Sequence, residues 1–188
     1  MIAHHLYKKE GIEVAFSPET LEKVQLIIKR YPEGRQKSAL LPILHIAQEE
    51  LGGYLSVDIM DYVASLLGIQ PIEVYEVATF YTMFHLEKTG TYVIEVCRTG
   101  PCAISGGEHI LDYLEKKLNV KTGETTTDGM FTLKTTECLG ACGNAPVMQV
   151  NTEYFEFLSH EKIDMILGTL KEKAFDKKPE GSKWVEKF

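Results

Sequence analysis

The sequence predicts an α+β protein in which an amino-terminal helical bundle is followed by a smaller βαββα domain. In the first half of the 188-residue chain, apolar residues recur at the spacing of amphipathic helices. Near Glu87-Lys88-Thr89-Gly90 the pattern becomes extended, with runs of β-branched and aromatic residues between helical segments. We therefore expect a helical domain over residues 1–88, a mixed domain over 89–175 and a tail over 176–188.

Four helices are expected in the first half because each has a start or stop signal. Ser17 can cap the first helix, which Pro18 opens and whose apolar spacing continues to Tyr31. Proline is tolerated only in the first turn of a helix, so Pro42 places the start of the second close to Ala39. The remaining signals are Gly52-Gly53, Ser56, Gly68 and Pro71. Amphipathic helices with short links predict a helical bundle.

The second half of the chain predicts a small mixed sheet with helices. The expected strands cover residues 91–97, 129–136, 147–150 and 154–157. Between the first two strands, Ser105 and Glu108 have the spacing of a capping box, which predicts the start of a helix. Strand, helix and strand in succession predict a right-handed βαβ unit. The last two strands predict a hairpin, and Ser159 can cap a final helix.

All four cysteines of the chain lie in this second half, as the pairs Cys97 and Cys102, and Cys138 and Cys142. Cys97 ends an expected strand, and Gly100-Pro101 forces a turn that brings Cys102 back toward it. A thiolate is a soft ligand. Four of them at loop-like spacings suggest an iron–sulfur cluster, a zinc ion or two disulfides.

The surrounding sequence favours the iron–sulfur cluster. A [2Fe–2S] cluster held by four thiolates is anionic, and backbone N–H groups aimed at its sulfurs stabilise that charge. Gly140 and Gly143 let the chain come close enough to supply such groups. Structural zinc sites usually use tighter cysteine pairs, and disulfides are uncommon in a chain without a secretion signal. Zinc is therefore the main alternative.

Several motifs of this chain are those of a known family. They are Cys97-x4-Cys102, Cys138-Leu139-Gly140-Ala141-Cys142-Gly143-Asn144-Ala145-Pro146, Ala39-Leu40-Leu41-Pro42 and Glu76-Val77-Ala78-Thr79-Phe80-Tyr81. With them the chain resembles the thioredoxin-like [2Fe–2S] subunit, of the 24-kDa type, of respiratory NADH:quinone oxidoreductase (complex I). The resemblance implies that all four cysteines hold one cluster and that the second domain has a thioredoxin-like fold. Thioredoxin folds carry a cis proline before the third strand, which makes Pro146 a candidate.

The same resemblance implies a single-electron carrier rather than a self-sufficient enzyme. Its partners would be the flavin- and NADH-binding subunit, which carries FMN and NAD(H), and the large iron–sulfur subunit nearby. The helical domain would serve for docking. The protein would be cytoplasmic and held at the inner membrane by other subunits. The alternatives are the equivalent subunit of an NAD-linked hydrogenase or formate dehydrogenase, and a non-redox zinc-binding scaffold.

Composition excludes several other functions. A net charge of −7 gives no electrostatic footprint for nucleic acid, and no apolar run approaches the about 18 residues needed to span a bilayer. No Gly-x-Gly-x-x-Gly or Walker-type loop is present, so nicotinamide and flavin must bind elsewhere. The six histidines are scattered and are not expected to be ligands. Arg98, inside the first cysteine loop, can stabilise a reduced cluster, contact a partner or face solvent. No catalytic residue is expected.

Overall fold

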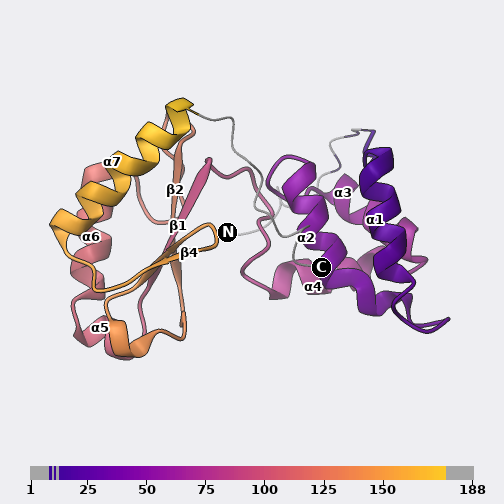
Figure 1. Ribbon diagram of the computed structural model, residues 1–188, viewed down its shortest axis with the longest axis horizontal. Coiled ribbons are helices and arrows are strands. Elements are labelled where there is room, and N and C mark those ends of the chain that lie inside the picture. Colours follow the sequence, from indigo (N-terminus) through magenta and orange to yellow (C-terminus); the bar gives the residue numbers. More distant parts are fainter. Residues whose placement is uncertain (1–8, 10, 12, 177–188) are drawn as a thin grey trace. The chain divides into compact units, whose positions relative to one another are not determined.

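The computed structural model describes residues 9, 11 and 13–176 (Figure 1). These residues divide into two compact units, with the boundary between Lys88 and Thr89. Apart from Asp176, the tail expected over residues 176–188 lies outside the described part of the chain. Among the described residues, no helix is both long and apolar enough to cross a membrane.

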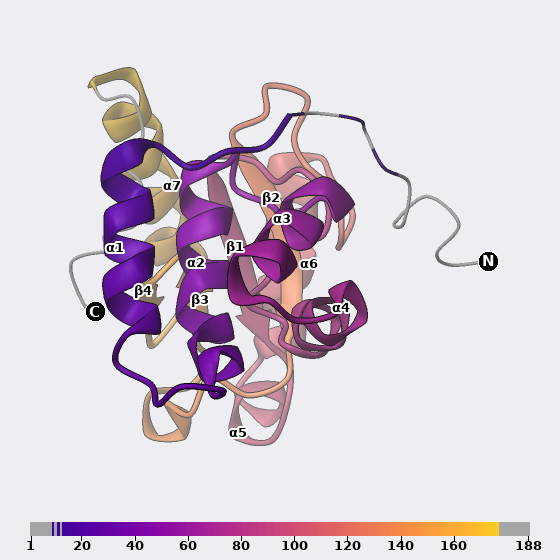
Figure 2. The same ribbon diagram turned by 90° about the vertical axis from the view of Figure 1, so that its right-hand side faces the viewer.

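The first unit is helical. It contains α1 (Pro18–Ile28), the 3-10 turn η1 (Gln36–Ala39), α2 (Leu40–Glu50), α3 (Val57–Leu67) and α4 (Pro71–Phe80). The helices are labelled in Figure 2, which looks onto this unit. Each of the four α-helices contributes a fully buried apolar residue to one continuous core, and these residues are Val24, Ile43, Val63 and Val74. Apolar burial of this kind is the main force that holds short helices together.

The expected helix caps in this unit are confirmed. Ser17 Oγ accepts a hydrogen bond from the N–H of Thr20 at 3.2 Å, and Ser56 Oγ accepts one from Ile59 at 3.3 Å. Each bond satisfies one N–H that a helix start otherwise leaves without a partner. Helix α1 ends at Ile28, earlier than its apolar spacing suggested. The residue before a proline avoids helical conformations, so the chain leaves the helix ahead of Pro32.

The second unit is built on a four-stranded sheet with the order β2-β1-β3-β4. Its strands are β1 (Tyr92–Cys97), β2 (Phe131–Thr136), β3 (Met148–Val150) and β4 (Glu153–Phe155). Strands β1 and β2 are parallel, and α5 (Pro101–Ile104) and α6 (Gly107–Leu118) connect them. Strand β3 pairs antiparallel to β1, and β4 completes a hairpin with β3. The sequence therefore predicted the βαβ unit and the hairpin correctly.

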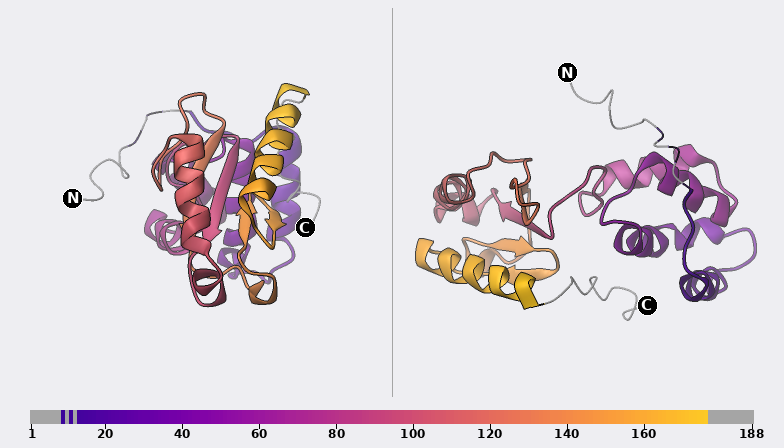
Figure 3. Two further views of the ribbon diagram at one scale, coloured as in Figure 1. Left: turned by 90° about the vertical axis from the view of Figure 1, so that its left-hand side faces the viewer. Right: turned by 90° about the horizontal axis from the view of Figure 1, so that it is seen from above.

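Helices α6 and α7 (His160–Asp176) cover one face of this sheet (Figures 1 and 3). The residues of greatest burial between sheet and helices come from both layers, and they are Ile94, Leu114, Leu133, Met148 and Ile163. Alternate residues of a strand point to the same face, so this register fixes which side chains of β1 and β2 enter the core. The Ala145–Pro146 peptide bond is cis, as expected.

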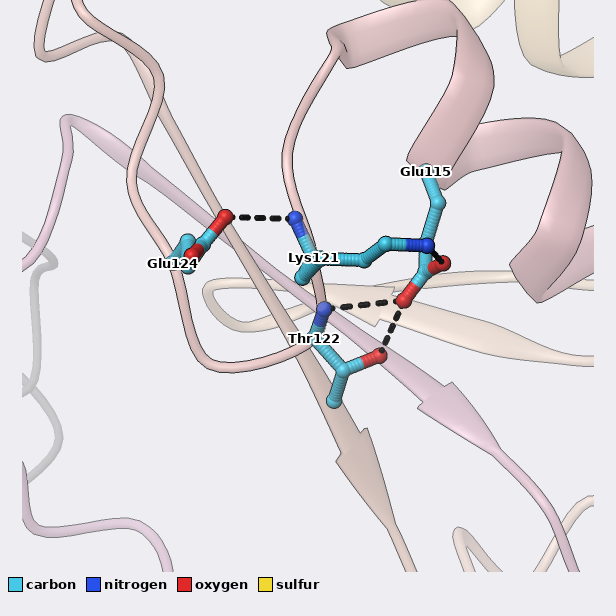
Figure 4. Close-up of polar contacts among 4 residues, drawn as sticks. All are labelled: Glu115, Lys121, Thr122 and Glu124. Atoms are coloured by element: carbon cyan, nitrogen blue, oxygen red, sulfur yellow. Dashed lines mark hydrogen bonds and ion pairs between the residues drawn. The ribbon is translucent and has the colours of Figure 1, made fainter.

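Acidic side chains hold the turn that leads from α6 into β2 (Figure 4). Glu115 forms an ion pair with Lys121 Nζ at 2.8 Å and accepts hydrogen bonds from the N–H and Oγ1 of Thr122. Glu124 accepts a hydrogen bond from the N–H of Lys121 at 2.7 Å. The chain then pairs with β2 through the N–H of Gly123 and the carbonyl of Leu133. These bonds fix where β2 begins.

The expected capping box at Ser105 and Glu108 is wrong. Ser105 ends the short helix α5, and α6 begins after Gly106, which has a φ of 91° and no side chain to cap the helix. The chain turns sharply between α5 and α6, and a left-handed residue is needed there, which glycine supplies without strain. Strand β4 is also shorter than expected, because Phe157 adopts a φ of 47° that ends extended structure.

The Ser56 cap can be tested by substitution. We expect Ser56→Ala to lower the free energy of unfolding by about 1 kcal/mol, because the N–H of Ile59 loses its acceptor. Ser65→Ala is the matched control, since Ser65 lies inside the same helix and only donates to the carbonyl of Tyr62. Urea titration measures both. Equal effects of the two substitutions would contradict the capping role.

Candidate metal centre

The four cysteines meet because two neighbouring strands end at the same edge of the sheet. Cys97 is the last residue of β1, and Thr136, its partner in the parallel pairing, is the last residue of β2. The chain beyond β2 reaches Cys138 after one further residue. Cys102 lies in α5, directly after the first strand, and Cys142 begins the 3-10 turn η2 (Cys142–Asn144). Cysteines far apart in sequence are therefore neighbours in space.

The thiols interact in pairs. Cys97 and Cys102 lie close enough for each to shift the pKa of the other, and the pKa of Cys142 responds to Cys138. Cys97 also interacts electrostatically with Cys142, which links the two pairs. All four cysteines are free thiols, so the disulfide alternative is not realised. The structure thus brings together all four residues that the sequence singled out.

The two pairs differ in their exposure to solvent. Cys97 and Cys102 are only 3% and 2% exposed, whereas Cys138 and Cys142 are exposed at the surface. The buried pair packs with Val147 in a small apolar cluster, against which Leu139, Ala141 and Ala145 also lie. The centre therefore has an inner side that excludes water and an outer side that solvent or a partner can reach.

Backbone N–H groups point at the cysteine sulfurs. Those of Thr99 and Leu139 face the sulfur of Cys97, and that of Val147 faces Cys102. The N–H of Gly140 lies 3.4 Å from Cys138 Sγ, at a residue whose φ of 76° suits glycine. Such donors stabilise negative charge on sulfur and cost nothing in reorganisation. They fit a site built for thiolates.

Burial, backbone N–H groups and neighbouring thiols shift the pKa values of three of the cysteines. Burial raises the pKa of Cys97, but the N–H groups of Thr99 and Leu139 outweigh it and the pKa is lowered. The pKa of Cys102 is raised by burial and then by its hydrogen bond to Cys97. The pKa of Cys142 is raised first by the charge of Cys138. Thiolates this close repel each other, so deprotonating all of them requires bound positive charge.

The four cysteines are a donor set that an iron–sulfur cluster takes. In the described part of the chain, no three side chains of His, Cys, Asp or Glu are positioned to bind one metal ion together. A [2Fe–2S] cluster is held by four cysteine thiolates shared between two irons. Cys97, Cys102, Cys138 and Cys142 supply four thiols at one edge of the sheet, with backbone N–H groups beside them.

Helix α6 packs at Gly107 against the backbone of the first cysteine loop, which runs from Cys97 to Cys102. A Cβ atom at this position would lie 2.8 Å from the carbonyl oxygen of Cys102 and 3.1 Å from that of Cys97. Only glycine therefore allows this approach. Gly107 was not singled out from the sequence as a site residue. The sequence feature that could have indicated it is its position, five residues after Cys102 at the start of a helix.

Two further residues that were not predicted from the sequence join the cysteine loops. The carbonyl of Glu137 accepts hydrogen bonds from Thr99 Oγ1 and from the Cys97 thiol. The carboxylate of Glu137 pairs with Arg98, with 2.5 Å between Oε1 and Nη2. Arg98 therefore forms an ion pair within its own chain, a contact that none of the three expectations for this residue included. Thr99 lies between Cys97 and Cys102, and Glu137 directly precedes Cys138. This closeness in sequence to the cysteines could have indicated both residues.

Comparisons with known proteins identify the family and related chains. Residues 24–171 match the profile of the family described as thioredoxin-like [2Fe-2S] ferredoxin. One NADH-quinone oxidoreductase subunit, from Rickettsia conorii, is 48% identical over 155 residues, which cover 82% of this chain and 93% of that protein. Mitochondrial NADH dehydrogenase [ubiquinone] flavoprotein 2 of Dictyostelium discoideum is 43% identical over 156 residues, covering 83% of this chain and 63% of that protein.

A solved structure shares the fold. The crystal structure of an NAD+-reducing [NiFe]-hydrogenase in the air-oxidized state superposes with a TM-score of 0.63 at 21% sequence identity. The match covers 78% of this chain and 25% of the hydrogenase chain, so this chain corresponds to one part of a longer polypeptide.

The close approach at Gly107 gives a prediction. We expect Gly107→Ala to lower the free energy of unfolding by about 1–3 kcal/mol, because the added methyl overlaps backbone atoms that cannot rotate away. Gly168→Ala is the matched control. Gly168 lies in α7, and nothing lies within 4 Å of the place that a Cβ atom would take, so alanine there is expected to stabilise by about 0.5–1 kcal/mol. Urea titration that finds the two variants alike would contradict the close approach.

Proposed function

Because the chain belongs to the thioredoxin-like [2Fe–2S] ferredoxin family, we propose that Cys97, Cys102, Cys138 and Cys142 hold one [2Fe–2S] cluster and that the protein carries single electrons. The observation that carries the proposal is the placement of four free thiols at one edge of the sheet, with backbone N–H groups aimed at their sulfurs. Zinc-binding scaffolds also use four cysteines, but the family that this chain matches is one of [2Fe–2S] proteins.

The residues of this chain have separate parts in that function. Cys97, Cys102, Cys138 and Cys142 would hold the [2Fe–2S] cluster, which would supply one-electron transfer with no bond to substrate formed or broken. The N–H groups of Thr99, Leu139, Gly140 and Val147 stabilise charge on the sulfurs. The apolar cluster around Val147 excludes water from the inner side. The exposed side, at Cys138 and Cys142, is where a redox partner can approach closely.

The relatives indicate the complex in which this occurs. They are named as parts of NADH-quinone oxidoreductase and NADH dehydrogenase, so we place this chain in an NADH-oxidising module. The donor would be reduced FMN on a partner subunit that also binds NAD(H), with the large iron–sulfur subunit as a further neighbour. The isolated chain would show no turnover. Other subunits would hold it at the cytoplasmic face of the membrane.

The helical first unit fits a docking role. It has an apolar core of its own, and none of the four cysteines belongs to it. Its helical bundle would bind the neighbouring subunits while the second unit carries the electron. The equivalent subunit of an NAD-linked hydrogenase is the second candidate, because the hydrogenase structure contains the same fold.

The cluster proposal predicts a defined metal content. After anaerobic reconstitution, the full chain is expected to contain iron and acid-labile sulfide in equal amounts, with one binuclear electron paramagnetic resonance signal after reduction by dithionite. Cys102→Ser is expected to abolish the signal, since the residue is buried and a neighbouring thiol cannot replace it. Ser105→Ala, an exposed position on the same segment, is the control. Stoichiometric zinc and no signal would overturn the proposal.

The complex can be tested separately. Affinity purification of the tagged full chain from its native cells is expected to bring down a flavin-containing chain that oxidises NADH. Flavin fluorescence and NADH–ferricyanide activity of the eluate measure this. A nickel-containing partner would favour the hydrogenase candidate, and an eluate without flavin would contradict both.

A further inference from the structure

An ion pair between Arg98 and Glu137 connects the segments that carry the two cysteine pairs. Arg98 follows Cys97 directly, and Glu137 directly precedes Cys138. Their side chains form an ion pair with 2.5 Å between Nη2 and Oε1. The N–H of Arg98 also donates to the carbonyl of Thr136 at 3.2 Å, which continues the parallel pairing of β1 and β2 beyond the strands. A side-chain contact and a backbone contact thus connect the loops.

This ion pair is poorly placed to stabilise the fold. The side chains of Arg98 and Glu137 are 57% and 70% exposed, and exposed ion pairs typically contribute less than about 1 kcal/mol. The loops are already joined by the carbonyl of Glu137, which accepts from Thr99 and Cys97. The two charges therefore need another explanation than stability.

Their position next to the cysteines supplies that explanation. One full positive and one full negative charge each lie one residue from a proposed cluster ligand. The reduction potential of an iron–sulfur centre depends on the charges around it, because reduction adds one negative charge to the centre. Arg98 alone would favour uptake of the electron, and Glu137 alone would oppose it. Together, within 2.5 Å, they leave almost no net charge beside the centre.

We propose that Arg98 and Glu137 form a charge-balanced pair across the two cysteine loops, in which Glu137 cancels the effect of Arg98 on the reduction potential of the centre that the loops hold. The inference rests on the proposed function, because it concerns the potential of the same centre. Both are positioning residues, since they would act on the centre through their charges and not as ligands of it. The influence of each charge on the reduction potential becomes measurable when the charge of its partner is removed.

The test is a redox titration of the reconstituted full chain, followed by electron paramagnetic resonance. The electron comes from dithionite. Arg98→Gln is expected to lower the reduction potential, because Glu137 then faces the centre without its counter-charge. Glu137→Gln is expected to raise it, because Arg98 is left uncompensated. The double variant is expected to return close to the unmodified protein, and both single shifts should shrink as salt screens the charges.

A second ion pair of the same unit provides matched controls. Lys121→Gln and Glu115→Gln remove the same charges from the pair at the far end of α6 (Figure 4). Glu115 lies eight residues along α6 from Gly107, or about 12 Å at the rise of an α-helix. The shifts in reduction potential of these two control variants are expected to be several-fold smaller than those of Arg98→Gln and Glu137→Gln. Charge-keeping variants Arg98→Lys and Glu137→Asp, which preserve the pair, are expected to leave the potential nearly unchanged.

The outcomes separate this inference from the proposed function. Shifts of the same sign in Arg98→Gln and Glu137→Gln, or shifts no larger than those of the controls, would overturn the charge-balanced pair while the binuclear signal itself stands. If one single variant loses its centre, the shift of the other single variant still decides the sign, because the proposal predicts the direction of each shift separately. No binuclear signal from the unmodified chain would overturn the proposed function and the inference together.

Discussion

The parallel pairing of β1 with β2 is the constraint on which the rest of the site depends. Six consecutive pairs, from Tyr92 with Phe131 to Cys97 with Thr136, bring the two strands to the same edge of the sheet in register. A slip of one residue would turn every side chain of a strand to the opposite face, and the buried core of Ile94 and Leu133 opposes such a slip. The apolar core therefore fixes the distance between the two cysteine loops.

Local structure then adapts the loops to charged sulfur. Glycine at position 140 turns an N–H toward Cys138, and glycine at position 107 admits the start of α6 against the carbonyls of the first loop. The buried and exposed pairs of cysteines give the centre a dry side and an accessible side. A centre that exchanges electrons with a partner needs both, because the dry side protects the sulfurs and the accessible side shortens the path to the partner.

Much of this arrangement could be predicted from the sequence, and the rest depended on contacts between distant residues. The strand ending at Cys97 and the caps at Ser17 and Ser56 follow from local spacing, and the structure confirms them. The start of α6 was predicted at a capping box because Ser105 and Glu108 have the right spacing. Nothing local shows that Gly107 must fit against Cys102, or that Glu137 meets Arg98 across 39 residues.

The central claim is that four thiolates of one chain hold two irons, and X-ray absorption at the iron edge tests it most directly. For the reconstituted full chain, we predict that sulfur alone surrounds each iron at the shortest distance, with a longer scattering path from a neighbouring iron. Nitrogen or oxygen among the nearest neighbours of iron, or the absence of any iron–iron scattering, would contradict the claim.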